Sequence, residues 1–260
     1  MNIFKQLIVS LYSPKDISAF RQQGIGKTIL YVFLLTLISL LPTLYFFSTT
    51  TINGVNILRD TIQNDLPAFT IENGELLSDK TAPVTINKND LTILFDSTGT
   101  VNQEDARRTT NSIFFLKNEL TYTIGGQSQS MPYSMFNNMT ITKDDLLELT
   151  SSMDSFLPIL LPIISVVIYL FSTISKFIGV SFLALIGLAL KNMLGKEIKY
   201  GRLWRLSAYS VTLPTIFFMI MDSLQTIVPS GFFIYWFVSI IILILVLKEI
   251  PSSKMISESN

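Results

Sequence analysis

The chain contains neither cysteine nor histidine among its 260 residues. Without cysteine it has no thiolate nucleophile and no disulfide framework. Without histidine it has no Ser-His-Asp triad, no haem ligation through imidazole and almost no route to a zinc site. Carboxylates, Lys, Ser and Tyr are the residue types left for catalysis. We therefore expect a protein that is not an enzyme and that uses no cofactor and no metal.

Charged residues are also scarce. They make up 15% of the chain, whereas hydrophobic residues make up 49%, and the formal net charge is zero. A neutral chain offers no bulk positive field for nucleic acid. A soluble domain of this size does not need several long uncharged apolar runs. These features predict an integral membrane protein that contacts the lipid bilayer and binds no nucleic acid.

The longest apolar run extends from Phe156 to Leu190. A membrane-spanning helix needs about 20 apolar residues, so this run is either one over-long helix or two spans joined by a turn near Ser175 and Lys176. In the second case Phe177 to Leu190 would be a short span, and the basic residues after it would lie outside, against the positive-inside tendency. We predict one long helix that runs from outside to inside.

A basic segment, residues 191–205, follows this run. Its positive side chains are Lys191, Lys196, Lys199, Arg202 and Arg205, and its single acid is Glu197. Such an excess beside a span is typical of the cytoplasmic side. We predict a topology determinant that also faces anionic lipid headgroups, and docking of a partner is the alternative.

Three further apolar runs accompany the long one. The predicted spans are residues 28–50, 156–190, 206–228 and 232–247. The other predicted parts are a cytoplasmic amphipathic segment (1–27), an outer domain (51–155) and a disordered tail (251–260). Residues 156–250 would form a three-helix membrane unit around the cytoplasmic loop 191–205. Lys15, Arg21 and Lys27 precede the first span, which predicts that both termini are cytoplasmic.

The N-terminal segment shows helical periodicity. Apolar residues recur at Ile3, Phe4, Leu7, Ile8 and Leu11. Such a helix either lies in the membrane interface or packs on the other helices, and the sequence alone leaves both open. A second helix is predicted to begin after Ser13, with Ser13 as N-cap, Pro14 at the first position and Asp16 in the first turn.

Residues 51–155 are predicted to fold as an α+β, β-rich extracytoplasmic domain inserted between membrane helices 1 and 2. A helix should continue from the first span to Leu66-Pro67. Strands are expected at residues 68–72, 76–77, 83–87, 91–95, 112–116 and 119–124. Asn73-Gly74 and Gly125-Gly126 are hairpin signals. Thr142 and Asp145 have the spacing of a capping box.

Two stretches of the chain carry carboxylates in patterns that resemble catalytic or metal-binding sites. Asp96-Ser97-Thr98-Gly99 superficially resembles an aspartic-protease motif, but it has one residue too many and occurs once, whereas that chemistry needs two carboxylates. A strand followed by an Asx turn is the better interpretation. Asp144, Asp145 and Glu148 supply too few ligands for a hard cation, and a solvated helix face is expected.

Lys176 and Asp222 are the ionisable residues placed well inside apolar runs. A charge at bilayer depth is costly and usually faces a partner or an aqueous cavity. Counted from Lys191 and Arg205, they lie about 22 Å and about 25 Å along their helices, at about 1.5 Å per residue. They are therefore a candidate intramembrane ion pair. The alternative is that each side chain reaches headgroups or water independently.

Several stretches together resemble a known family. They are FKQLIVSLYSPKDISAFRQQGIGKTILYV, LPAFTIENGEL, ILFDSTG and LIGLALKNMLGKEIKYGRLWRLSAYSVTLP. The chain is similar to a Gram-positive bacterial family of uncharacterised membrane proteins labelled maltodextrin utilisation proteins. Its C-terminal helices are loosely similar to Yip-type membrane proteins. The resemblance implies a multi-pass protein of the bacterial plasma membrane and an association with sugar uptake, and it transfers no catalytic residues.

Three functions remain open on these grounds. The first is a non-enzymatic accessory protein of the cell envelope, whose outer domain binds a partner protein or glycan and whose helices contact a membrane protein such as a sugar transporter. The second is a transporter or channel subunit that acts as a homo-oligomer. The third is a membrane hydrolase built on Ser/Lys or carboxylate chemistry. The first is the expected one.

Overall fold

A computed structural model describes residues 1–88, 91–101, 104, 109–136 and 139–251. The chain divides into two compact units. Met1–Phe47 and Pro162–Asn260 form one of them, called here the helical unit, and Ser48–Leu161 form the other, called the β unit. The predicted disordered tail falls almost entirely outside the described residues.

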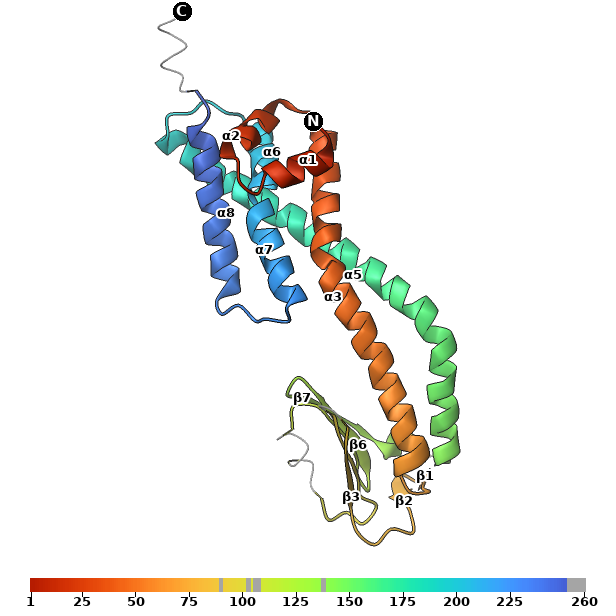
Figure 1. The fold of residues 1–260 in the computed structure, drawn as a ribbon. Helices are drawn as coiled ribbons and strands as arrows, with labels where there is room; N and C mark the ends of the chain where they lie inside the picture. Colours follow the sequence, from red (N-terminus) through yellow and green to blue (C-terminus); the bar gives the residue numbers. More distant parts are fainter. Residues whose placement is uncertain (89–90, 102–103, 105–108, 137–138, 252–260) are drawn as a thin grey trace, which may run out of the picture. The chain divides into compact units, whose positions relative to one another are not determined.

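The long helices of the chain are drawn in Figure 1. They are α3 (Ile25–Asp60), α5 (Lys143–Met193), α6 (Tyr200–Ser210) continued by α7 (Thr212–Ser223), and α8 (Gly231–Lys248). In the described part of the chain, four helical stretches are long and apolar enough to cross a membrane. This confirms the predicted four long apolar helices and fits a multi-pass membrane protein. Which ends face the cytoplasm stays a prediction.

Helix α5 is continuous through Ser175 and Lys176. This confirms the predicted single long helix and excludes the alternative of two spans joined by a turn at these residues. The third stretch differs from its predicted bounds of 206–228, because it runs from Tyr200 to Ser223. The chain leaves the helix at Gln225, which has a φ of 52°, and Pro229 cannot rejoin a helical hydrogen-bond ladder.

The N-terminal residues form α1 (Ile3–Val9), α2 (Pro14–Ala19) and a 3-10 turn η1 (Phe20–Gln22). The Ser13 hydroxyl accepts a hydrogen bond from the Asp16 N–H at 3.2 Å, which confirms the predicted cap. In α1, Gln6 and Val9 are buried, while Phe4 and Ile8 stay 57% and 56% exposed. One face of α1 therefore packs on the helical unit, and the other keeps an apolar surface.

A buried polar network fixes these short helices to α6. The Tyr209 ring lies between those of Phe20 and Tyr31 in tilted arrangements, with ring centroids 4.7 and 4.2 Å away. Its hydroxyl donates to Gln6 Oε1 at 3.0 Å and accepts from Gln23 Nε2. Gln6 Nε2 also donates to Gln23 Oε1 at 2.8 Å. Side chains from four separate elements thus meet around one fully buried tyrosine.

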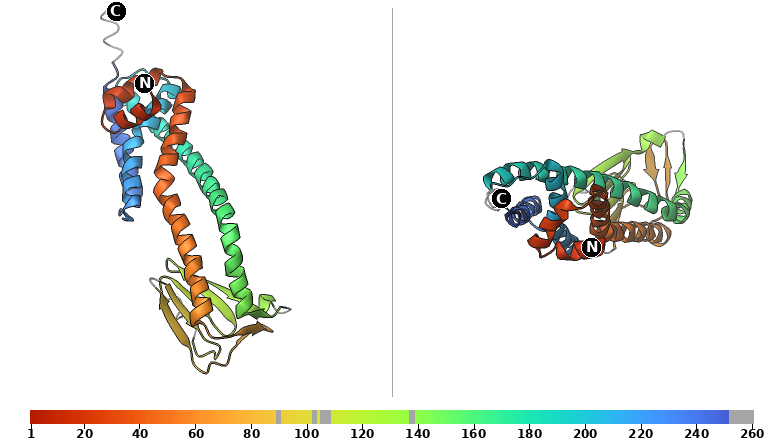
Figure 2. Two further views of the ribbon diagram at one scale, coloured as in Figure 1. Left: turned by 45° about the vertical axis from the view of Figure 1, so that its right-hand side comes forward. Right: turned by 90° about the horizontal axis from the view of Figure 1, so that it is seen from above.

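Close packing of α5 against α6 and α8 depends on Gly187. A Cβ placed at Gly187 would lie 3.3 Å from the Cδ2 atoms of both Leu203 and Leu243. Such a distance is tight for carbon atoms, so the helices approach one another where no side chain separates them. Figure 2 shows α5, α6 and α8 together in views from two further directions.

The β unit contains two sheets. One has the order β2-β1-β8 and the other β3-β4-β5-β6-β7. The strands are β1 (Thr70–Glu72), β2 (Glu75–Leu77), β3 (Val84–Lys88), β4 (Leu91–Phe95), β5 (Ser112–Phe115), β6 (Glu119–Ile124), β7 (Gln127–Pro132) and β8 (Ile141–Thr142). All neighbouring strands are antiparallel except β4 and β5, which pair in parallel.

Both predicted hairpins are confirmed. Asn73 and Gly74 link β1 to β2 with φ angles of 51° and 82°, and Gly125 and Gly126 link β6 to β7 with φ angles of 58° and 80°. Positive φ at both central residues is the geometry of the two-residue turns that match strand twist. These turns set the register in which the flanking side chains reach the core.

The core of the β unit lies between the five-stranded sheet and the chain that leads into it. Helix α3 ends in a π-helical turn, η2 (Thr61–Asp65), which confirms the predicted helix up to Leu66-Pro67. The buried residues of this core are Ile62, Leu66, Phe69, Ile71, Leu76, Ile93, Phe95, Phe115 and Tyr133.

At the start of α5, Thr142 N–H donates to Asp145 Oδ2 at 2.7 Å, and Asp145 N–H donates to Thr142 Oγ1 at 3.3 Å. The predicted capping box at the start of α5 is confirmed.

Arg59 joins the two helical segments of the β unit. Its guanidinium Nη2 contacts Asp154 Oδ1 at 2.8 Å and the Thr150 carbonyl oxygen at 2.5 Å. Arg59 belongs to the last turns of α3, and both partners belong to the first turns of α5. The chain therefore enters and leaves the β unit at adjacent points.

Candidate functional site

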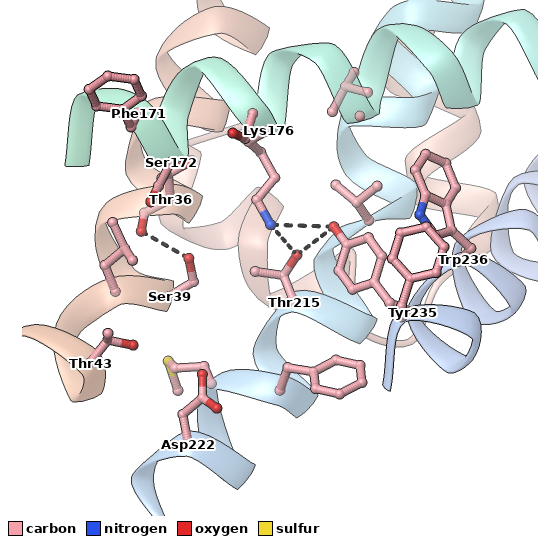
Figure 3. Close-up of a pocket in the computed structure, with 18 residues that line it drawn as sticks. Thr36, Ser39, Thr43, Phe171, Ser172, Lys176, Thr215, Asp222, Tyr235 and Trp236 are labelled. Carbon is pink, nitrogen blue, oxygen red and sulfur yellow. Dashed lines mark hydrogen bonds between the residues drawn. The ribbon is translucent and has the colours of Figure 1, made fainter. Parts of the chain in front are cut away.

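The helical unit contains an open cavity of about 530 Å³. Side chains from α3, α5, α7 and α8 line it, as Figure 3 shows. Its polar lining includes hydroxyl groups from α3 and α5 together with two charged residues, Lys176 and Asp222. Polar groups within long apolar helices are costly unless they have partners or face a cavity. This cavity is therefore the candidate functional site.

Lys176 is the best-defined charged group of the cavity. Its Nζ donates to Thr215 Oγ1 at 3.1 Å and to the Tyr235 hydroxyl at 3.3 Å. Nζ also lies 5.2 Å from the centroid of the Tyr235 ring, close enough for a cation–π interaction. The two hydroxyl groups are themselves 3.1 Å apart. The three side chains come from α5, α7 and α8 and form one triangle (Figure 3).

The hydrogen-bond inventory of this triangle leaves more donors than acceptors, since two hydrogens and only one hydroxyl lone pair remain after the internal bonds. An ammonium group carries three N–H donors and no acceptor, and Lys176 uses two of them on the hydroxyl oxygens. One hydroxyl donates to the other, so one hydroxyl hydrogen also remains. The triangle thus offers a positive charge and two hydrogens to whatever occupies the cavity.

Asp222 lines the same cavity but does not join the triangle. Among the described residues, no ion pair connects it to Lys176, and Figure 3 shows the two side chains apart. Thr215 and Asp222 are separated by two helical turns of α7, about 10 Å at about 1.5 Å per residue. The structure brings both predicted residues to one cavity, and a direct Lys176–Asp222 pair remains a prediction.

The remaining lining of the cavity is largely apolar. Phe171 and Phe232 line it and are themselves 69% and 71% exposed. Trp236 also lines it, with its ring centroid 5.4 Å from that of Phe182 in an edge-on arrangement. The cavity is therefore amphipathic, since a cationic, hydroxyl-rich centre is combined with aromatic walls.

Sequence reasoning found Lys176 but not the residues that surround it. Thr215 and Tyr235 lie in separate apolar runs that hold other hydroxyl residues too, such as Thr212 and Ser239, so nothing in the sequence singles them out. On α3, Ser39 Oγ bonds the Thr36 carbonyl at 2.9 Å, and both residues line the cavity.

The basic segment is more ordered than a loop. Because α5 extends to Met193 and α6 begins at Tyr200, only residues 194–199 connect them. Three of its positive side chains bind backbone carbonyls. Lys191 binds that of Ile198, Lys196 that of Ile250 and Arg205 that of Arg21. Lys199 and Arg202 are exposed, so the predicted contact with lipid headgroups applies best to these two.

Asp96 forms the predicted Asx turn. Its Oδ1 accepts from the Thr98 N–H at 2.8 Å, and its Oδ2 accepts from the Val101 N–H at 2.7 Å. Burial raises the pKa of the Asp96 carboxyl, but hydrogen bonds from the Thr98 hydroxyl and from backbone N–H groups outweigh it, so the pKa lies below its usual value. This carboxylate stabilises the end of β4.

The acidic cluster at the start of α5 has a local explanation as well. Asp145 caps the helix through Thr142, while Asp144 and Glu148 lie on the exposed part of that helix. Within the described ranges, no group of three or more acidic side chains is arranged to hold a metal ion. The solvated-face interpretation of Asp144 and Glu148 agrees with this arrangement.

Comparison with known proteins identifies the family. A model of the family described as "Protein of unknown function (DUF1189)" matches residues 4–247. Since this match covers nearly the whole chain, the chain belongs to that family. No curated protein and no solved structure matches the chain. The maltodextrin label and the likeness to Yip-type proteins stay predictions.

Proposed function

We propose that this DUF1189 protein is a non-enzymatic accessory membrane protein of the bacterial cell envelope. Its β unit lies outside the plasma membrane and binds a partner protein or a glycan. Its helical unit contacts a second membrane protein, for which a sugar transporter is the choice that the family resemblance favours. Both chain ends lie in the cytoplasm in this proposal.

The observation that carries the proposal is the length of two helices. Helix α3 has 36 residues and α5 has 51, which correspond to about 54 Å and about 76 Å of helix. The hydrocarbon core of a bilayer is only about 30 Å thick. The surplus is uninterrupted helix that leads directly into the β unit, and an accessory protein that presents a binding domain needs such a connection.

The β unit also offers a surface for a partner. Tyr122 and Ile124 are alternate residues of β6 and therefore point to the same face of the sheet. They are 39% and 70% exposed. Exposed apolar side chains that are adjacent on one face are typical of interaction sites, so we place partner contacts here.

A transporter or channel subunit that acts as a homo-oligomer is the second candidate. The amphipathic cavity of the helical unit favours it, because polar groups at bilayer depth commonly mark substrate or ion pathways. One copy supplies four apolar helical stretches in the described residues. In this candidate function, several copies would assemble so that their helices together line a pore.

Site-specific photo-crosslinking in living cells tests the proposal. A photoreactive residue replaces Ile124, and the matched control replaces Asp79, an exposed polar position of the same unit. We expect adducts with another envelope or transport protein from position 124 and not from position 79. Retention of the purified full-length protein on immobilised maltodextrin tests the glycan form of the proposal.

The outcomes separate the two candidates. Adducts of position 124 with a different protein, or retention on the glycan matrix that free maltodextrin reverses, support the accessory role. Adducts that join only two copies of this chain support the homo-oligomeric subunit instead. If position 124 yields no more adducts than position 79 and the glycan matrix retains nothing, the accessory role is wrong.

A further inference from the structure

We propose that the cavity of the helical unit is a binding site for an anionic amphiphile, a molecule with a carboxylate or phosphate head and an acyl tail. The head binds the triangle of Lys176, Thr215 and Tyr235, and the tail lies along the aromatic wall. This site is separate from the partner surface of the β unit, and neither proposal depends on the other.

Charge is the first argument for an anionic head. The ammonium of Lys176 has only uncharged partners in its triangle, Thr215 and Tyr235. The acid that shares its cavity, Asp222, stands two helical turns further along α7. A positive charge surrounded by long apolar helices is strongly destabilised unless an anion or water accompanies it. An anion bound at the triangle supplies the missing negative charge.

The free hydrogens are the second argument. One ammonium hydrogen and one hydroxyl hydrogen remain at the triangle after its internal bonds are made. Both would point to acceptors, and ionised carboxylate or phosphate oxygens are the strongest acceptors because charge-assisted hydrogen bonds are about twice as strong as neutral ones.

The walls of the cavity supply the argument for a tail. Phe171 and Phe232 line the cavity and are exposed at the same time, so the cavity opens between apolar side chains. Such an opening favours an acyl chain, because contact with these side chains removes apolar surface of both from water. The volume of about 530 Å³ lies within the range of about 300–1,000 Å³ that is usual for ligand sites.

Tryptophan fluorescence reports on this site directly, because Trp236 lines the cavity. The other tryptophan, Trp204, stacks on Phe177 with centroids 6.1 Å apart. It is replaced in a Trp204→Phe background, so that Trp236 alone emits. The purified full-length protein is titrated in detergent at pH 8 with 9,10-dibromostearate, whose bromine atoms quench tryptophan, and with its uncharged methyl ester. Comparing the acid-to-ester ratio of half-quenching concentrations between variants cancels the partitioning of each compound into micelles, because that partitioning is the same for every variant.

We expect the acid to quench Trp236 at an approximately tenfold lower concentration than the ester, which corresponds to about 1.4 kcal/mol. Lys176→Met should abolish this preference. Lys176→Arg should retain most of it, because the charge and donors remain. Lys80→Met is the matched control, since it removes one exposed positive charge that belongs to the β unit, and it should leave the preference unchanged.

Tyr235→Phe keeps the aromatic ring and removes one hydroxyl, so it tests the site if Lys176→Met fails to fold. We expect a reduction of the preference by a few-fold. Brominated phosphatidylglycerol compared with brominated phosphatidylcholine distinguishes a lipid from a free fatty acid as the ligand, and preference for either anion supports the site. Equal quenching by acid and ester in the parent protein, or a preference that survives Lys176→Met, overturns the proposal.

Discussion

Replacement of Tyr209 by Phe is the sharpest test of how the N-terminal helices are held. The substitution removes one oxygen atom and leaves the ring in place between Phe20 and Tyr31, with centroid distances of 4.7 and 4.2 Å. The hydroxyl of Tyr209 is the donor that the described residues provide to Gln6 Oε1. It is also an acceptor for Gln23 Nε2.

The expected cost follows from these contacts. A hydrogen bond contributes about 0.5–1.5 kcal/mol net, and a buried group left without a partner costs about 1–3 kcal/mol. Gln6 is 2% exposed, so water cannot easily replace the lost donor. Gln23 keeps its bond to the Thr28 hydroxyl at 3.1 Å, which limits the loss on that side. We expect the free energy of unfolding to fall by about 2 kcal/mol, about thirtyfold in the equilibrium constant.

Reversible unfolding of the full-length protein in mixed micelles, driven by sodium dodecyl sulfate and followed by circular dichroism, measures this change. Tyr12→Phe is the control, because Tyr12 is 70% exposed and its substitution should change stability by less than about 0.5 kcal/mol. Hydrogen exchange should also become faster in α1. A Tyr209→Phe protein as stable as the Tyr12→Phe protein would show that the network does not hold the N-terminal helices.

Three further predictions concern other parts of the chain. A cysteine at position 97 should react with a membrane-impermeant thiol reagent in intact cells and one at position 12 should not; the reverse pattern would invert the proposed topology. Asp96→Asn should destabilise the β unit by about 1.5–3 kcal/mol at pH 6. Because the folded carboxyl has a lowered pKa, its contribution is fully present above the ordinary value of about 3.9 and is lost as pH falls from there through the lowered pKa of the folded state. Hydrogen exchange should therefore show the difference between the two proteins shrinking as pH falls below about 3.9. Gly187→Leu should destabilise by about 1–3 kcal/mol in the unfolding assay, whereas Gly54→Leu, with open space around it, should have little effect; equal effects would refute the close packing.

Local chemistry explains why many boundaries were predictable from the sequence. The cap at Ser13, the hairpin at Asn73-Gly74 and the capping box at Thr142 each depend on residues within four positions of one another. Such short-range signals act before any tertiary contact is made. The four apolar stretches were predictable for a similar reason, since their length and lack of charge are properties of continuous sequence.

Tertiary contacts explain what the sequence did not reveal. Strand β7 reads Gln-Ser-Gln-Ser-Met-Pro, which has no apolar alternation, and only its pairing with β6 makes it a strand. Likewise, the partners of Lys176 are Thr215 on α7 and Tyr235 on α8. Helical spacing within each run cannot say which polar residues of different helices meet, so the cavity was foreseen only through its two charged members.

The ion pair between Arg59 and Asp154 bears on how the segment between them can be exchanged during evolution. Arg59 of α3 and Asp154 of α5 form an ion pair that holds these two helices together. The residues between them are therefore, in topological terms, one long loop of a helical hairpin. Insertions and exchanges are best tolerated where the chain ends of a module lie close together. The segment between Arg59 and Asp154 thus meets the geometric condition for exchange as one module, because its two ends are held side by side.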